Sequence, residues 1–239
     1  MDLISAWPRI AADAWPRIAA DLDATGCAVT PPLLDADACA ALAALYEDPA
    51  PFRSRVVMAR HGFGRGEYRY FAYPLPDPLP ALRSALYAGL APVAERWRLA
   101  LGGAGEAFPD RLDAFLARCH AAGQAKPTPL LLSYGPGDYN CLHQDLYGPH
   151  VFPLQATILL SAPGRDFEGG EFVLTEQRPR MQSRAEVVPL AQGQAVIFAV
   201  NHRPVQGSRG IYRVAMRHGV SRVRAGLRRT LGIILHDAA

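Results

Sequence analysis

His143-Gln144-Asp145 is the most informative stretch of this chain, and His218 and Arg228 follow it further along the sequence. Residues i and i+2 of a β-strand project to the same face. His143 and Asp145 can therefore approach one point from a single strand, while Gln144 points away. A second imidazole from His218 would complete a cluster of two histidines and one carboxylate.

Such a cluster is the ligand set of non-haem Fe(II) oxygenases, which leave coordination positions open for a co-substrate and O₂. The third ligand has two candidates in the sequence. His202 closely follows the apolar stretch that ends at Phe198, whereas His218 lies ten residues before Arg228. We favour His218, which places an insertion at about residues 199–217 between the strand and the ligand.

The region around this triplet has the pattern of β-strands separated by glycine turns. The pattern predicts buried strands at residues 152–161 and 228–235, a Gly turn that leads into a strand at 166–174, and two strands joined by a Gly turn at 187–198. In the last of these, Arg228, Thr230 and Gly232 share one face, and Arg229 lies on the other.

The N-terminal part has a helical pattern instead. Strong helix formers predict helices at residues 35–46, 79–101 and 110–122. Asp35 and Asp110 are the expected N-caps of the first and the last of them. We therefore expect one α+β domain over residues 1–239, with a mainly helical support region at 1–126 and a β-rich catalytic core at 127–239.

The order of these motifs resembles the double-stranded β-helix, or jelly roll, of the Fe(II)/2-oxoglutarate-dependent dioxygenases. The matching features are Tyr134 and Gly137 before the triplet, Phe167-Glu-Gly-Gly-Glu171, the Pro189…Gly193…Phe198 strand pair, and His218…Val223…Gly226-Leu-Arg228. The prolyl-hydroxylase-like branch has the same order and the same separation between the last ligand and the arginine. The resemblance covers roughly residues 128–236.

The resemblance implies a cofactor and a role for each of these residues. His143, Asp145 and His218 would bind Fe(II). Arg228, with Tyr134 and Thr230 beside it, would hold 2-oxoglutarate, because a guanidinium grips a carboxylate through two hydrogen bonds. O₂ is the other co-substrate, and oxidative decarboxylation would give succinate and CO₂. A non-enzymatic jelly roll is disfavoured, since the ligand set and the arginine are both complete.

A closer resemblance extends over nearly the whole chain, to a bacterial oxygenase family proposed to remove alkyl groups oxidatively from damaged DNA. The segments that carry it are residues 58–71, 73–76, 217–221 and 231–237. It implies a demethylase that acts on alkylated nucleobases in DNA. A base inside a duplex would have to be flipped out or presented single-stranded. The alternative, favoured by the prolyl-hydroxylase-like spacing, is a hydroxylase of a protein side chain or a small metabolite.

The arginines of the chain are compatible with a nucleic-acid partner. Net charge is only +3, but every basic residue except Lys126 is Arg, and residues 187–236 contain no acid. Arginine suits phosphate recognition and stacking on aromatic rings. A GC-rich genome and a solvated surface would also account for this composition. The expected substrate-binding residues are Arg65, Arg69, Tyr70, Tyr139, Asn140 and Tyr147.

Other features bear on the location of the protein. No segment has 18 consecutive apolar residues, and the first residues lack the basic and apolar regions of a signal peptide. The four cysteines show no Cys-x-x-Cys spacing and predict reduced thiols, so we expect a cytoplasmic protein without a membrane partner. The octet at residues 6–13 recurs at 14–21, which we interpret as a duplication that extends a helix.

Overall fold

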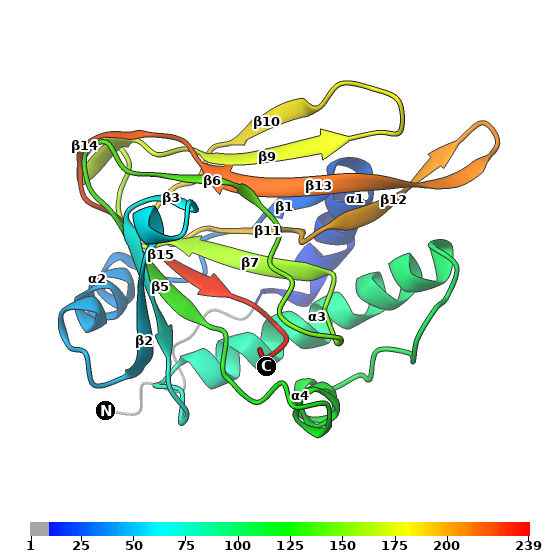
Figure 1. Cartoon of the computed structure of the whole chain (residues 1–239), viewed down its shortest axis with the longest axis horizontal. Helices are drawn as coiled ribbons and strands as arrows, with labels where there is room; N and C mark the ends of the chain where they lie inside the picture. Colours follow the sequence, from blue (N-terminus) through cyan, green and yellow to red (C-terminus); the bar gives the residue numbers. More distant parts are fainter. Residues whose placement is uncertain (1–9) are drawn as a thin grey trace.

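The computed structural model describes residues 10–239, in which two antiparallel sheets face each other and helices cover the back of the larger sheet (Figure 1). The expected absence of a signal peptide and the first half of the first octet concern residues 1–9, which lie outside the described part. Within that part, no helix is both long and apolar enough to cross a membrane.

The major sheet supplies one wall of the site. Its strand order is β1-β11-β7-β15-β5-β4-β2. The strands are β1 (Cys27–Val29), β11 (Ala195–Ala199), β7 (Leu154–Leu159), β15 (Arg228–Ile233), β5 (Leu130–Tyr134), β4 (Glu67–Phe71) and β2 (Phe52–Val57). Strand β15, the last in the chain, lies between β7 and β5 at the centre of the sheet, so its side chains are buried on both faces.

The minor sheet supplies the opposite wall, with strand order β10-β9-β13-β6-β3. Its strands are β10 (Arg184–Val188), β9 (Phe172–Gln177), β13 (Gly210–Val220), β6 (Tyr139–His143) and β3 (Gly64–Arg65). A short pair, β8 (Phe167–Gly169) and β14 (Val223–Gly226), connects the sheets at one end. The insertion expected at 199–217 is a hairpin of β12 (His202–Gly207) with β13, which projects at the other end (Figure 1).

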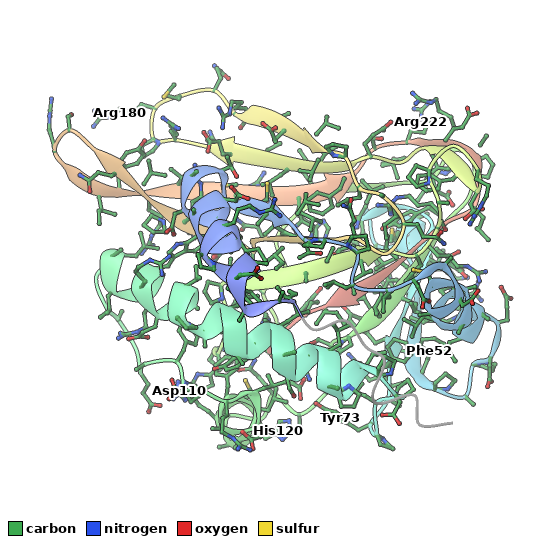
Figure 2. All side chains as sticks on the ribbon, turned by 180° about the vertical axis from the view of Figure 1, so that it is seen from behind. Phe52, Tyr73, Asp110, His120, Arg180 and Arg222 are labelled. Carbon is green, nitrogen blue, oxygen red and sulfur yellow. The ribbon has the colours of Figure 1, made fainter. Side chains whose placement is uncertain are left out.

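Four α-helices are found among residues 10–239: α1 (Trp15–Thr25), α2 (Ala36–Ala44), α3 (Leu79–Ala100) and α4 (Leu112–Ala121). Seen from behind, α1 and α3 cross the outer face of the major sheet (Figure 2). Their apolar faces join the sheet in one core, to which Leu22, Leu90 and Ile197 belong. The two helices also touch closely, because a Cβ atom at Gly89 would lie 2.1 Å from the Trp15 ring.

Two local predictions about these helices differ in outcome. Asp35 is the N-cap of α2, and its side chain accepts a hydrogen bond from the Ala38 amide at 2.8 Å. The Asp110 prediction is wrong: Arg111 is the N-cap of α4, and no side chain caps that helix. Three-residue 3-10 turns also occur at η2 (Ala12–Ala14), η3 (Leu45–Glu47) and η4 (Met58–Arg60).

The duplicated octet does not extend an α-helix through the described part of its first copy. Helix α1 begins at Trp15, inside the second copy, and Ala12–Ala14 form only a 3-10 turn. Pro16 stands in the first turn of α1, where a proline is tolerated because its missing N–H would have no helical partner.

Residues 1–126 contribute more than helical support. This part also supplies β1, β2, β3 and β4, and β4 pairs directly with β5 of the core. The sequence Glu67-Tyr-Arg-Tyr-Phe71 alternates between the two faces of the major sheet, so its polar residues are compatible with a strand. Strand β4 thereby becomes one wall of the site described next.

Candidate metal centre and its pocket

Three side chains form a cluster suited to a metal ion: His143, Asp145 and His218 offer donor atoms that all lie within 4.8 Å of one another. His143 ends β6, and His218 is its direct partner in the neighbouring strand β13. The His143 Nε2 atom lies 3.5 Å from Asp145 Oδ1, and His218 Nε2 lies 3.3 Å from Oδ2. The predicted triplet and its partner therefore do meet.

The strand geometry expected for the triplet needs one correction. Strand β6 ends at His143, so Asp145 reaches the cluster from the segment that follows the strand. At this point the Gln144 side chain donates hydrogen bonds to the carbonyls of Met216 at 2.8 Å and Asn201 at 3.2 Å, which anchor the segment after β6 to the chain around β13.

His202 lies outside the donor cluster. It stands at the start of β12, opposite Ala215 of β13, whereas His218 lies three residues further along β13, beside β6. The minor sheet thus selects His218, because only the part of β13 that pairs with β6 can face Asp145.

Both imidazoles are held in orientations that suit metal binding. The Nδ1 atom of His143 lies 2.8 Å from the Cys141 carbonyl oxygen, so it carries the proton and leaves the Nε2 lone pair free. The His218 ring packs on Phe172 and Phe198, with ring centroids 6.1 and 4.5 Å away. Burial lowers the pKa of His218, and His143 lowers it further. A neutral imidazole is the form that binds a metal.

Asp145 is a buried carboxylate with hydrogen-bond donors on both oxygens. Burial alone would raise its pKa, but hydrogen bonding and the charge interaction with His218 outweigh it and hold the pKa below its ordinary value. Tyr147 donates a hydrogen bond to Oδ1 at 2.7 Å, and Gln155 donates one to Oδ2 at 2.8 Å. The group is therefore ionised at neutral pH. Gln155 was not predicted as a site residue, because it lies ten residues after Asp145, in β7.

Arg228 is a buried cation that faces the same cavity. Its side chain is 1% exposed, and its guanidinium lies 5.5 Å from the ring centroid of Tyr134, its direct partner on β5. Neither Nε nor Nη1 has a hydrogen-bond partner, and no carboxylate of residues 10–239 forms an ion pair with it. Burial lowers the pKa of Arg228 to about 10, so the group stays charged at neutral pH.

A buried charge without a partner is costly, and a ligand carboxylate would satisfy it. The residues present therefore fit the carboxylate co-substrate that the ligand set implies. Thr230 lines the cavity on the same face of β15 as Arg228. Arg229 faces the other way, where it donates to the Ala43 carbonyl at 2.7 Å and pairs with Glu47. The alternation of side chains predicted for this strand is therefore found in β15, with Arg228 and Thr230 on one face and Arg229 on the other.

The cavity between the sheets has a volume of about 360 Å³, which is in the range of small-molecule sites. Its polar and charged lining converges from both sheets, and the rest is mainly aromatic and aliphatic. Residues that face it include Phe63, Tyr68, Tyr70, Leu132, Tyr134, Asn140, His143, Asp145, Tyr147, Gln155, His218, Arg228 and Thr230.

Only half of the expected substrate-binding residues line this cavity. Tyr70, Asn140 and Tyr147 do, whereas Arg65, Arg69 and Tyr139 do not. Arg69 alternates with Tyr70 on β4, so it points to the opposite face, where its guanidinium lies 4.6 Å from the Tyr46 ring centroid. Arg65 and Tyr139 are register partners in β3 and β6, and the Arg65 side chain is 63% exposed.

The structure adds Tyr68 and Phe63 to the candidate residues. Tyr68 shares a face of β4 with Tyr70, so strand periodicity applied to this segment would have found it. Phe63 lies in the turn between η4 and β3, where no periodicity operates.

Comparisons with known proteins agree with this geometry. A family model described as "Oxygenase, catalysing oxidative methylation of damaged DNA" matches residues 66–238. An uncharacterized protein of Mycobacterium tuberculosis (strain ATCC 25618 / H37Rv) is 50% identical over 169 residues, which are 71% of this chain and 72% of that protein. A protein of strain CDC 1551 / Oshkosh, also uncharacterized, matches to the same extent.

Solved structures resemble the chain in fold. A 2OG-Fe(II) oxygenase family oxidoreductase from Burkholderia pseudomallei has a TM-score of 0.55 at 18% identity, covering 97% of this chain and 96% of that one. A Pseudomonas putida prolyl-4-hydroxylase has a TM-score of 0.52 at 15% identity, covering 91% and 96%. The fold is therefore the double-stranded β-helix of the Fe(II)/2-oxoglutarate oxygenases. Because the family model matches residues 66–238, which are most of the chain, the protein belongs to the oxygenase family of that model.

Proposed function

We propose that this oxygenase removes alkyl groups from damaged nucleobases in DNA. His143, Asp145 and His218 hold Fe(II), and Arg228 holds the far carboxylate of 2-oxoglutarate with Tyr134 and Thr230 beside it. The observation that supports the metal and co-substrate roles is the cavity itself, in which three converging donor groups face the same space as the buried guanidinium of Arg228, whose Nε and Nη1 have no hydrogen-bond partner.

When bound, Fe(II) and 2-oxoglutarate would supply an oxidation that couples decarboxylation of the co-substrate by O₂ to hydroxylation of a substrate C–H bond. On an N-methyl base, one oxygen atom enters the methyl C–H bond and gives a hemiaminal, whose C–N bond breaks to release formaldehyde and the N–H base. The residues of the protein bind and orient the substrate and co-substrate, and they exclude water from the cavity. Tyr68, Tyr70 and Leu132 form an aromatic and aliphatic wall opposite the imidazoles.

Residues 60–65, at the rim of the cavity, have aromatic and basic side chains that favour a planar, anionic partner. Phe63 is 48% exposed, and its ring stacks on His61 with centroids 5.3 Å apart and planes 22° apart. Arg60 and Arg65 are exposed in the same short segment. An aromatic platform beside arginines is the combination that stacks bases and tracks phosphates of single-stranded nucleic acid.

This platform is fixed in place by the backbone. The Phe63 amide donates to the Met58 carbonyl at 3.2 Å, and the Phe63 carbonyl accepts from the Cys141 amide at 2.9 Å. Gly64 makes the close approach possible, because a Cβ atom there would lie 2.4 Å from the Tyr139 carbonyl oxygen. An exposed aromatic residue held this firmly favours a binding role over a packing role.

A second candidate is a hydroxylase of a protein side chain or a small metabolite. The observation that favours it is the inward orientation of several arginines. Arg69 stacks under Tyr46, and Arg203 is buried in an ion pair with Glu176 at 2.8 Å. The exposed Arg180 and Arg222 lie at opposite ends of the minor sheet (Figure 2). The basic surface is therefore smaller and more dispersed than the sequence suggests.

The decisive test measures succinate and formaldehyde release by the iron-loaded enzyme with N-methylated single-stranded DNA, the same DNA as a duplex, methylated peptides and amino acids. We expect release of both products with methylated DNA, strongest on the single strand because no base pair must open. Turnover confined to peptides or amino acids would overturn the DNA assignment and favour the hydroxylase.

A binding measurement with matched variants completes this test. The double variant Arg60→Ala/Arg65→Ala should weaken single-stranded DNA binding and reduce its salt slope by about 0.7 for each lost phosphate contact. Arg111→Ala is the control, since Arg111 is also exposed but lies at the start of α4 and pairs with Asp113. Equal effects of both changes would show that the rim is not the binding surface.

A further inference from the structure

The carboxylate of Asp145 is enclosed by groups that are not themselves metal donors. Tyr147 donates to Oδ1 at 2.7 Å and Gln155 donates to Oδ2 at 2.8 Å, so each oxygen has a defined partner. Asp145 is 7% exposed and Gln155 is 4% exposed, so water does not replace these partners freely. A carboxylate on a short side chain can rotate about two bonds, and these two hydrogen bonds fix that rotation.

Tyr147 is itself fixed from two directions. The Tyr70 hydroxyl donates to the Tyr147 hydroxyl at 3.1 Å, with the two rings edge to face and 6.4 Å apart. The Tyr147 carbonyl accepts from the Gln124 side chain at 3.1 Å. The Tyr147 hydroxyl therefore has one direction left in which to donate, and that direction leads to Asp145.

The chain of contacts continues to the far edge of the major sheet. The Tyr70 ring lies under the guanidinium of Arg53, 4.5 Å from its centroid, and Arg53 donates from Nε to the Pro127 carbonyl at 2.9 Å. Strands β2 and β4 thus brace Tyr70 on the side away from the cluster, while its hydroxyl points toward Tyr147.

We propose that Tyr147 and Gln155 are positioning residues that orient Asp145 toward the metal, and that Tyr70 sets the orientation of Tyr147. This inference rests on the proposed role of Asp145 as a metal ligand. Groups that hydrogen-bond a ligating carboxylate or imidazole typically change metal affinity 10- to 100-fold when they are removed. Because Tyr70 also lines the substrate cavity, a substrate that contacts it touches the same set of hydroxyls.

Co(II) titration of the metal-free protein tests the inference without turnover. Binding is followed by the visible absorption of Co(II), whose intensity and position report the ligand geometry. Tyr147→Phe and Gln155→Leu should each weaken Co(II) binding by about 10- to 100-fold and alter the spectrum. Tyr70→Phe should have a smaller effect in the same direction, since Tyr147 keeps its bond to Asp145.

Tyr134→Phe is the matched control. It removes a hydroxyl from the same cavity, but that hydroxyl contacts Asn140 at 3.4 Å and not Asp145. In the absence of 2-oxoglutarate, the Tyr134→Phe variant should bind Co(II) with the same affinity as the unaltered protein. Thermal unfolding of each metal-free variant separates a loss of positioning from a loss of fold.

The possible outcomes separate this inference from the metal assignment. Unchanged Co(II) affinity and spectrum in Tyr147→Phe and Gln155→Leu would overturn the positioning role while leaving the ligands in place. Retained Co(II) binding in His143→Ala would instead overturn the metal assignment. If Tyr147→Phe does not fold, Gln155→Leu in β7 and Tyr70→Phe in β4 carry the same test.

Discussion

Arg228 and Arg229 are adjacent in β15, yet they occupy different environments because strand side chains alternate between faces. Arg228 lies in the cavity with two unpartnered nitrogens. Arg229 packs outward against Tyr46, with its guanidinium 5.1 Å from the ring centroid, and pairs with Glu47. The same residue type therefore faces the cavity without a hydrogen-bond partner at Nε and Nη1 at one position and stabilises the fold at the next.

Replacing these two arginines should give different losses. Arg228→Ala should raise the dissociation constant of 2-oxoglutarate by an amount equivalent to about 2–5 kcal/mol, because a buried ligand carboxylate loses its charged partner. Fe(II) should remain bound, since Arg228 is not part of the donor cluster. Calorimetric titration of the metal-loaded protein with 2-oxoglutarate measures the effect.

Arg229→Ala is the companion measurement. It should lower the free energy of unfolding while leaving 2-oxoglutarate affinity close to normal, because its contacts are to Ala43 and Glu47. An equal loss of 2-oxoglutarate affinity in both variants would contradict the proposed role of Arg228.

At the scale of elements, the turn between β8 and β9 shapes the space that Arg228 occupies. Gly169 and Gly170 both have positive φ, at 74° and 62°. A Cβ atom at Gly170 would lie 2.7 Å from Arg228 Cδ and 2.8 Å from Val223 Cγ2. The turn therefore needs glycine both for its backbone and for the side chain that passes it.

Gly170→Ala should displace the Arg228 side chain and weaken 2-oxoglutarate binding about 10-fold or more, a loss of roughly 1.4 kcal/mol. Gly164→Ala provides the control, because Gly164 also has a positive φ, 77°, but a Cβ atom there would meet nothing within 4 Å. Both variants carry backbone strain, so only the difference between their 2-oxoglutarate dissociation constants is diagnostic. The absence of any difference would rule out the steric role of Gly170.

The elements also show what the sequence could and could not predict. Strand 228–235 and the cap at Asp35 were predictable because alternation and capping are local. Arg69 was expected at the substrate site, but the alternation of side chains along β4 places it on the face opposite to Tyr70. Gln155 could not be predicted as a partner of Asp145 for a different reason, because the two residues meet only after β7 pairs with the rest of the sheet.

At the scale of the whole molecule, the last residues of the fold join its helices to its sheets. Arg83 of α3 forms a buried ion pair with Asp237 at 2.7 Å, and His120 of α4 lies 2.8 Å from the same carboxylate. Tyr73 adds a hydrogen bond to Asp237 at 2.8 Å, near His120 at the lower edge of the molecule (Figure 2). This network joins α3 and α4 to the segment that follows β15. Breaking a buried pair by removing one partner typically costs 3–5 kcal/mol.

His236, next to this network, should make the stability of the fold depend on pH. It is fully buried, and burial lowers its pKa to about 4. Between pH 6.5 and 4 the unfolded chain binds a proton that the folded chain does not. The free energy of unfolding should therefore fall as the pH decreases through this window, by on the order of 3 kcal/mol from this residue.

Urea unfolding of His236→Asn between pH 7.5 and 4 checks this expectation. The asparagine oxygen can accept the hydrogen bond that His236 Nδ1 accepts from the Phe152 amide at 3.3 Å, but it does not titrate. The variant should show a flatter decline of stability in the same window. Parallel curves for the two proteins would exclude His236 as the titrating group.

Gln124 links the segment that contains Tyr147 to the segment at residues 236–238. Its Nε2 atom, which carries two hydrogens, lies within 3.1 Å of the carbonyl oxygens of Tyr147, His150 and Asp237, and its Oε1 atom accepts from the His150 amide at 2.8 Å. Gln124 therefore ties the segment after His143 and Asp145 to the segment at 236–238. We expect the backbone amides of the two segments to become accessible to hydrogen exchange together. Cleavage or fraying at residues 236–238 would therefore loosen Tyr147 and weaken metal binding, although these residues are not part of the donor cluster.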